Sequence, residues 1–290
     1  ETGKISGIGG ESMKIKQRWV RGLLTVVFGI CAVTSVYPLI WMFINSFKET
    51  TEIMTGESFG LPHIWKFSNY TDALFNRHIL KFFINSVVVT GATLLLTIVV
   101  SVMLAYALTR MRWKLSTKVS KVVTLGILLP SQIVIVPIFM MLRSMHLINN
   151  PLSLILTITA FNIAMSTLMC SSFLSGIPYE MEEAAVMDGA GIFSILFKVI
   201  VPIIKPAIAT MSINTFINSW NEFIYSLVLI NGETYRTLPI ALMNYSSGKY
   251  GTDYGGMYAA MVITSVLPVL LFVFFSNQVE KTFSAGAILK

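Results

Sequence analysis

Polar residues recur at helical spacing inside an apolar stretch near residue 220. They follow offsets of 0, 4, 7, 8 and 11 positions, which places them on one face of a helix: Asn214, Asn218, Asn221, Glu222 and Tyr225. Amides, a carboxylate and an aromatic ring can hydrogen-bond to a polar solute and stack on it. We therefore expect this face to line a pathway, as a binding surface or as a gate. Contact between helices is the alternative, since the same side chains join helices in membranes.

Glu222 is the acidic member of this face, and its depth matters. It follows Pro206 by about 16 residues, hence by roughly 24 Å along a helix that begins there. This depth is in the outer half of a bilayer, where a carboxylate is costly unless it faces water or a partner. Gln132 and Asn162, in two other apolar stretches, are further candidates for the same pathway.

The segment 175–205 carries signals for two short helices joined at a corner. Pro178 suits the first turn of a helix, because its missing N–H would have no partner there. Carboxylates follow it and complement the positive end of the helix dipole: Glu180, Glu182 and Glu183. Gly189 and Gly191 then end or bend this helix. We expect Gly189 to need a positive φ or the close approach of another chain.

The second helix of this segment has one apolar face. Its members follow the spacing i, i+3, i+4 and i+7: Phe193, Leu196, Phe197 and Ile200. Pro202 and Pro206 mark the return toward the next apolar stretch. Two short helices with such a face form a compact projection, whose apolar surface must be covered by something.

The composition of the 290-residue chain is that of a membrane protein, with 54% hydrophobic and 12% charged residues, whereas soluble domains have about 25% charged residues. The excess of Lys and Arg over Asp and Glu is explained by the membrane topology described below, and we do not take it as a sign of nucleic-acid binding. Cys31 and Cys170 lie in apolar runs, so we expect reduced thiols packed in helices, and no Cys or His spacing fits a metal site. The sequence also contains no phosphate-binding loop of the form GxxxxGK[ST].

Six stretches are apolar over the roughly 20 residues that a membrane-spanning helix needs. They are 20–46, 82–109, 119–142, 151–174, 206–230 and 257–279. We therefore expect an all-α, polytopic membrane protein with six transmembrane helices in one domain, residues 13–290. Residues 1–12 are small and polar and precede Met13, which looks like a natural start. We expect them to be an added or disordered leader outside the fold.

Basic residues set the orientation of membrane proteins, because cytoplasmic loops are rich in Lys and Arg. When both termini are placed in the cytoplasm, the inner segments hold roughly twice as many Lys and Arg as the outer segments. The outer loops 47–81 and 231–256 are then long enough to dock a partner or to cap a pathway. They can equally be mere connectors.

Part of the segment 175–205 resembles the EAA loop of permeases, the membrane subunits of ATP-binding-cassette (ABC) importers. Glu183-Ala184-Ala185, a three-residue gap, Gly189, a nine-residue gap and Val199-Ile200-Val201-Pro202 follow that pattern, with Val in place of its Ile and Leu. The resemblance implies the type I ABC-importer permease architecture, in which this loop couples the spans to an ATPase. The coupling residues would be Glu183, Ala184, Ala185, Asp188, Gly189, Phe193, Phe197 and Pro202.

Further segments resemble the carbohydrate branch, similar to the second membrane subunit of maltose-type importers. They are Asn85-Ser86, Ala105-Tyr106-Ala107-Leu108 with Arg110, Leu129-Pro130-Ser131-Gln132 with Pro137, Trp220-Asn221-Glu222-Phe223 and Thr237-Leu238-Pro239. This likeness implies a sugar importer in a bacterial or archaeal cytoplasmic membrane, and this chain would form half of its pathway. In the maltose-type relatives most sugar contacts belong to the partner permease, so a gating role fits Glu222 as well as sugar binding does.

The resemblance also implies partners. They are a second permease subunit that forms a heterodimer, two ATPase subunits that hold ATP and Mg, and an extracytoplasmic solute-binding protein. The chain itself would be no enzyme and would bind no cofactor and no nucleic acid.

Three alternatives stay open. A homodimeric ABC permease for amino acids, phosphate, a polyol phosphate or metals shares the EAA loop, but usually lacks the Trp-Asn-Glu-Phe and Thr-Leu-Pro segments. A membrane-embedded enzyme needs a convergent acid, base, nucleophile or metal set, and one Glu without a His or Asp partner is a poor start. An ion-coupled carrier predicts internal repeats and ionisable pairs near the midplane, and the sequence shows neither.

Overall fold

The computed structural model describes residues 6–246 and 253–288, which contain helices and no strand. The long helices are α1 (Ser6–Asn45), α4 (Ile79–Thr109), α7 (Pro151–Ser175), α11 (Lys205–Trp220) and α14 (Tyr254–Ile288). The shorter α-helices are α2 (Thr50–Met54), α3 (Ser68–Thr71), α5 (Ser116–Leu128), α6 (Ile135–Ser144), α8 (Glu180–Met187), α9 (Ile192–Ser194), α10 (Val201–Ile203), α12 (Ile224–Leu229) and α13 (Leu238–Ser246). The remaining turns are η1 (Glu57–Phe59) and two π-helical segments, η2 (Asp72–Asn76) and η3 (Ile195–Ile200).

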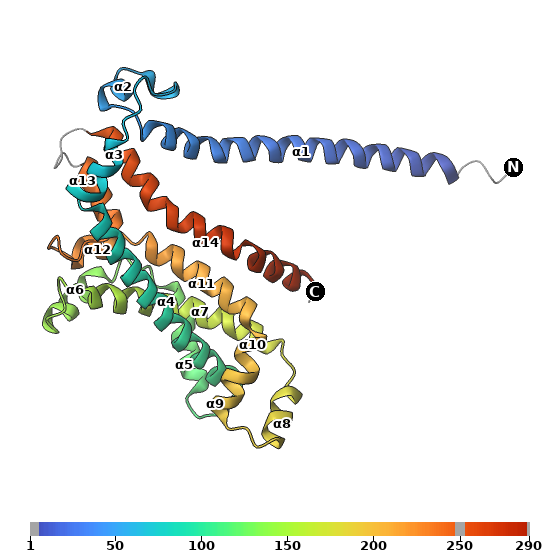
Figure 1. Ribbon diagram of the computed structural model, residues 1–290. Coiled ribbons are helices and arrows are strands. Elements are labelled where there is room, and N and C mark those ends of the chain that lie inside the picture. The colour runs from blue at the N-terminus through green and yellow to red at the C-terminus, as the bar shows by residue number, and fades with distance from the viewer. Residues whose placement is uncertain (1–5, 247–252, 289–290) are drawn as a thin grey trace.

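Helices α4 and α7 form the centre of the molecule, and α11 packs against both (Figure 1). Their contact faces carry small hydroxyl side chains. Thr93, Thr97 and Ser101 of α4 are fully buried, and Ser166 Oγ on α7 lies 3.5 Å from Thr215 Oγ1 on α11. Because small side chains let helix backbones approach closely, these three helices form a tight unit.

Local signals set where α7 begins. The side chain of Asn150 accepts a hydrogen bond from the backbone N–H of Leu152 at 2.9 Å, and Pro151 occupies the first turn. An amide oxygen at this position satisfies a backbone N–H that has no partner within the helix, and proline has no N–H to satisfy. The observed helix agrees closely with the predicted window 151–174.

Two predicted windows are not continuous helices. In the window 119–142, α5 ends at Leu128 and α6 begins at Ile135, with Leu129 extended before Pro130. A proline disfavours the helical conformation of the residue before it, which explains the break. In the window 206–230, α11 ends at Trp220 and α12 begins at Ile224.

By length and composition, four helical segments of the described chain could each cross a membrane: Val20–Asn45, Ile79–Thr109, Pro151–Ser175 and Tyr254–Phe275. A fifth is possible if Ile192–Ile203 and Lys205–Trp220, which meet at 79°, count as one bent span. The number of six spans therefore stays a prediction.

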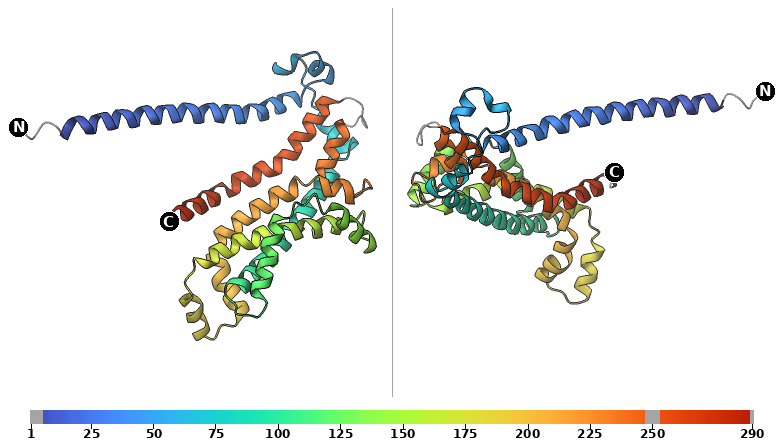
Figure 2. Two further views of the ribbon diagram at one scale, coloured as in Figure 1. Left: turned by 180° about the vertical axis from the view of Figure 1, so that it is seen from behind. Right: turned by 45° about the horizontal axis from the view of Figure 1, so that its top comes forward.

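Helix α1 contacts the other helices near its C-terminal end, and its N-terminal part extends away from them, as both figures show (Figure 1, Figure 2). There the Trp41 and Tyr258 rings meet edge to face, with centroids 5.3 Å apart. None of the most apolar window of Val20–Asn45 is buried within this chain. The helix begins at Ser6, inside the expected leader 1–12, of which residues 1–5 lie outside the described part.

The connecting segments gather at two ends of the molecule. At one end, Arg77 and Asp253 form an ion pair of 2.6 Å between the segment after η2 and the start of α14. At the other end, α8 and α9 lie beside the C-terminal end of α4, opposite to α2 and α3 (Figure 1). The expected outer loops 47–81 and 231–256 thus meet each other, although residues 247–252 lie outside the described part.

Candidate functional site

The first candidate site is the projection made by α8, α9 and η3. At its corner Gly189 has a φ of +79°, as the sequence predicted. Its N–H donates to the carbonyl of Val186 at 2.9 Å, and the N–H of Ala190 donates to the carbonyl of Ala185 at 3.0 Å. These two bonds form a Schellman motif, whose left-handed position favours glycine. An added Cβ at Gly189 would meet nothing within 4 Å in this chain.

The outer side of this projection is apolar and uncovered. Its exposed apolar side chains are Met181, Val186, Met187, Ile192, Phe193 and Phe197. Glu180, Glu183 and Asp188 in the same segment are exposed as well. Of the other residues expected to couple, Ala184 and Pro202 are also exposed, whereas Ala185 is half-buried. Exposed apolar side chains gathered on one short segment are typical of a protein interface.

The inner side of the projection is anchored by apolar packing. Ile195, Leu196 and Ile200 of η3 are buried against a cluster that includes Val102 of α4 and Leu174 of α7. None of the residues of α8 is buried, and only Ala185 packs against this cluster. The apolar anchor therefore holds η3, and other contacts must hold α8.

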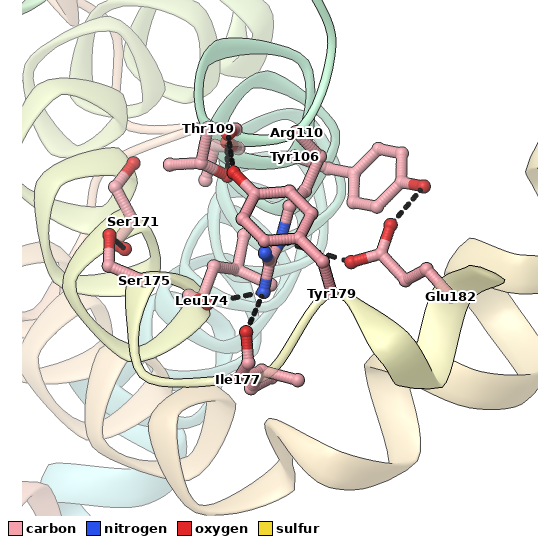
Figure 3. A network of polar contacts seen from close by, with 10 residues as sticks. Tyr106, Thr109, Arg110, Ser171, Leu174, Ser175, Ile177, Tyr179 and Glu182 are labelled. Atoms are coloured by element: carbon pink, nitrogen blue, oxygen red, sulfur yellow. Dashed lines mark hydrogen bonds and ion pairs between the residues drawn. The ribbon is translucent and has the colours of Figure 1, made fainter.

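A polar network supplies those contacts (Figure 3). Arg110, just after α4, pairs through Nε with Glu182 Oε1 at 3.0 Å. Its Nη2 donates to the carbonyl oxygens of Leu174 and Ile177, both at 2.6 Å. Its guanidinium lies over the ring of Tyr179, 4.2 Å from the centroid. Arg110 thus contacts the end of α7, the turn that precedes α8 and the first turn of α8 itself.

Two tyrosines complete the network (Figure 3). The hydroxyl of Tyr106, one turn before Arg110 on α4, donates to Glu182 Oε2 at 3.0 Å. The hydroxyl of Tyr179 donates to the carbonyl of Thr109 at 3.2 Å. Both oxygens of Glu182 are therefore bound by side chains from the C-terminal end of α4.

The second candidate site is a pocket of about 290 Å³ between α7, α11 and α12. Polar and aromatic side chains line it: Phe161, Asn162, Asn218, Glu222 and Tyr225, with Ser131 from the break between α5 and α6. The structure thus brings together four of the seven residues that we expected along the pathway, from both sides of the broken window 206–230.

Glu222 and Tyr225 shape this pocket at the break between α11 and α12. Glu222 Oε1 accepts a hydrogen bond of 2.8 Å from the backbone N–H of Tyr225, so the carboxylate caps the start of α12. The Tyr225 hydroxyl donates to the carbonyl of Ser131 at 2.5 Å. Its ring stacks on Phe161, with centroids 5.7 Å apart. Such aromatic surfaces flanked by amides and a carboxylate can bind a polar ring compound.

Three of the expected pathway residues lie elsewhere. Asn214 is half-buried on α11, outside the pocket lining. Asn221 is exposed, and its side-chain nitrogen donates to the carbonyl of Ile217 within its own helix at 3.0 Å. Gln132 is exposed and lies next to Ser131, outside the pocket lining. Among the described residues no group of three or more His, Cys, Asp or Glu side chains could hold a metal ion.

Sequence reasoning did not anticipate Phe161 in the pocket or the role of Glu182 in the network. Phe161 precedes Asn162 directly, so an aromatic next to a buried amide was a usable signal. The sequence indicated Glu182 only as one of three acidic residues that complement the helix dipole. Its partner Arg110 lies 72 positions earlier in the chain, so no local pattern connects the two. The spacing of Tyr106 and Arg110 at i and i+4 showed that they share a helix face, but not what that face meets.

The sequence is similar to known transport proteins. Residues 97–284 match the family described as binding-protein-dependent transport system inner membrane component. The chain is 33% identical to the diacetylchitobiose uptake system permease protein of Streptomyces coelicolor, over 88% of this chain and 84% of that protein. It is 31% identical to the sulfoquinovosyl glycerol transport system permease protein of Agrobacterium fabrum, over 91% of this chain and 92% of that protein.

The fold is also similar to a solved structure. A chain of a bacterial ABC transporter involved in the import of the acidic polysaccharide alginate superposes with a TM-score of 0.76 at 24% sequence identity. The match covers 91% of this chain and 97% of that chain. The helical arrangement described above is therefore that of an ABC importer permease.

Proposed function

The chain belongs to the family of inner membrane components of binding-protein-dependent transport systems, and on this premise we propose that it forms half of the translocation pathway of an ABC importer for a sugar. Membership in this family makes it a transporter subunit of the inner membrane. The relatives named above carry diacetylchitobiose and sulfoquinovosyl glycerol by their names, and both cargoes are sugar derivatives.

The observation that carries this proposal is the pocket beside the break between α11 and α12. It combines the amides of Asn162 and Asn218, the carboxylate of Glu222 and the stacked rings of Phe161 and Tyr225. Sugars present hydroxyls that pair with amides and carboxylates, and apolar ring faces that pack on aromatic rings. The amino-acid, phosphate and metal alternatives find less support, because the similar permeases carry sugar derivatives.

We assign the ATP-driven step to a separate ATPase, present as two subunits that hold ATP and Mg. Its docking surface on this chain is the exposed apolar side of α8, α9 and η3, which includes Phe193 and Phe197. The Schellman corner at Gly189 leaves open space outside the chain, so an ATPase groove can close around it. Glu183 is exposed, so its carboxylate is free to pair with a basic residue of the ATPase in this proposal.

A second permease subunit completes the pathway, as a heterodimer with this chain. Helix α1 and the C-terminal half of the Tyr254–Phe275 segment expose large apolar side chains, among them Phe28, Phe272 and Phe274. A partner subunit and lipid together cover such surfaces. We infer that this partner contributes the residues of the pathway that face the pocket.

The topology that we propose places six spans in the membrane, with both termini in the cytoplasm of a bacterial or archaeal cell. The clustering of the segments 47–81 and 231–256 at one end, and of α8 with Arg110 at the other, supports it. The extracytoplasmic solute-binding protein would dock on the former group.

Reconstitution tests the proposal. The complete complex in proteoliposomes, loaded with ATP and supplied with its binding protein, should take up a sugar from a panel of neutral, amino and acidic oligosaccharides. Uptake should need ATP hydrolysis. Uptake of amino acids or phosphate in place of every sugar would refute the sugar assignment, and transport without an ATPase would refute the coupling.

A further inference from the structure

The position of α8 depends on polar contacts far more than on apolar burial. None of the eight residues of α8 is buried, and Met187 is 87% exposed. The neighbouring segment η3, in contrast, buries Ile195, Leu196 and Ile200. Loss of a polar contact at α8 should therefore free this helix while η3 stays anchored.

Arg110 makes the central contact. Its side chain is 3% exposed and that of Glu182 is 12% exposed, so both charges have left bulk water. A buried charge is strongly disfavoured without its partner, which makes the pair hard to open at this place. A lysine could not replace the guanidinium without loss, because Arg110 contacts Glu182, the Leu174 carbonyl in α7 and the Ile177 carbonyl before α8 at the same time.

Arg110 joins α4 to α7, and both helices are connected to the pocket. Helix α7 carries Phe161 and Asn162, which line the pocket. Helix α4 packs along α7 and α11. A displacement of α8 that is passed through Glu182 to Arg110 thus reaches the pocket through two rigid helices.

We propose that Arg110 and Glu182 form the joint that transmits movement of α8 to α4 and α7. The two residues are positioning residues, with Tyr106 and Tyr179 as supports. This inference rests on the proposed docking of an ATPase on α8. The joint makes the projection and the ends of α4 and α7 move as one body, so that closure of the ATPase changes the pocket.

The test uses the complete importer in proteoliposomes and measures assembly, ATP hydrolysis and sugar uptake on the same preparations. Arg110→Ala and Glu182→Gln remove the ion pair, and Arg110→Lys keeps the charge without the planar fork. Arg112→Ala is the matched control for Arg110, because Arg112 is exposed two positions later. Glu180→Gln, in the same turn of α8, is the matched control for Glu182.

We expect Arg110→Ala and Glu182→Gln to keep the assembled complex and its ATP hydrolysis. The sugar taken up per ATP should fall roughly five- to a hundredfold, the range of typical coupling between sites. Arg110→Lys should lie between these variants and the unmodified chain. Since the two residues act as one joint, the double variant should lose no more than the stronger single variant. Both controls should match the unmodified chain.

A normal uptake-to-ATP ratio in Arg110→Ala and Glu182→Gln would overturn the proposal. So would a loss of uptake that follows the loss of assembled complex in all three variants, because the pair would then act on stability alone.

A distance measurement does not depend on the cargo. Spin labels at Met111→Cys and Glu180→Cys, with Cys31→Ser and Cys170→Ala, report the separation of α4 and α8 in the complex, and both positions are exposed. Arg110→Ala should broaden this distance distribution. If the unmodified complex takes up no sugar but the distribution broadens, the proposed cargo fails and the joint stands. An unchanged distribution overturns the joint.

Discussion

The side-chain nitrogen of Asn218 donates a hydrogen bond to Oδ1 of Asn162 at 3.1 Å and so joins α11 to α7 at the wall of the pocket. Asn162 is buried, and its own side-chain nitrogen donates to the carbonyl of Ile158 at 2.9 Å. Its orientation is thus fixed from two sides. Asn218 is exposed and keeps one amide proton and its oxygen for a solute.

Replacement of Asn218 by Ala should weaken sugar uptake and leave the complex assembled. The loss of one hydrogen bond, about 1 kcal/mol, corresponds to a rise of about fivefold in the sugar concentration for half-maximal uptake. Uptake curves at saturating ATP measure it. Thr210→Ala on the same helix is the control, since that hydroxyl donates to the carbonyl of Pro206 in its own helix at 3.1 Å and lies outside the pocket lining. Unchanged half-saturation in Asn218→Ala would exclude this residue from the pathway.

The carboxylate of Glu222 has two roles that substitutions can separate. Glu222→Gln keeps an oxygen for the N–H of Tyr225, so we expect normal assembly. Glu222→Leu loses the cap of α12, at a cost of about 1–3 kcal/mol, and should impair sugar flux or uncouple ATP hydrolysis from it. Assembly in detergent and transport are measured on the same variant. Loss of the complex in step with transport would instead assign Glu222 to helix–helix contact.

The segment around α8 could be predicted in detail because its signals are local. Pro178, the three carboxylates and Gly189 each act within a few residues, and the predicted positive φ of Gly189 is confirmed at +79°. The predicted all-α class needed only the apolar composition. The windows 119–142 and 206–230 are each divided between two helices, and hydropathy alone does not register a break within an apolar run.

The long-range contacts could not be predicted from the sequence. Arg110 and Glu182 are both charged residues near helix ends, where solvent exposure is the ordinary state. Only the packing of η3 against Val102 and Leu174 brings them together and removes them from water. The pocket has the same origin, since Asn162 meets Asn218 only because α7 packs on α11.

Two effects decide which side chains can replace Gly189. One is the backbone strain of a positive φ within this chain, and the other is contact with the ATPase. Gly189→Asn adopts positive φ with little strain, whereas Gly189→Ala costs about 1 kcal/mol. Neither meets an atom of this chain. If the ATPase closes around the corner, Gly189→Leu should reduce docking far more than Gly189→Ala does. Co-purification of the ATPase measures docking.

Gly191→Ala is the control for this series, because Gly191 has a φ of −75° and open space around it. Equal docking for Gly189→Leu and Gly191→Ala, with normal transport in both, would contradict the role of the corner.

Reversal of charge at Glu183 should weaken ATPase docking without disturbing the fold. Its carboxylate is exposed, and an exposed pair with a basic residue of the ATPase contributes about 0.2–1 kcal/mol, while like charges repel. We expect Glu183→Lys to insert normally but to stimulate ATP hydrolysis less. Glu180→Lys reverses an exposed charge one turn earlier and serves as the control. Normal transport by Glu183→Lys would remove this residue from the coupling surface.

The last prediction concerns the orientation of the two ends of the molecule. Thr55 and Met187 are both exposed, at the end that carries α2 and at the end that carries α8. In a chain with Cys31→Ser and Cys170→Ala, expressed without the ATPase that we propose to cover Met187, a membrane-impermeant maleimide added to intact cells should modify Thr55→Cys and spare Met187→Cys. Met111→Cys, beside Arg110, should behave like Met187→Cys, and opening the membrane should expose both. Basic residues stay on the cytoplasmic side because their transfer is opposed during insertion, so we expect Arg110 and its neighbours on that side. Strong labelling of Met187→Cys on intact cells would reverse the topology and would move the ATPase docking surface to the wrong side of the membrane.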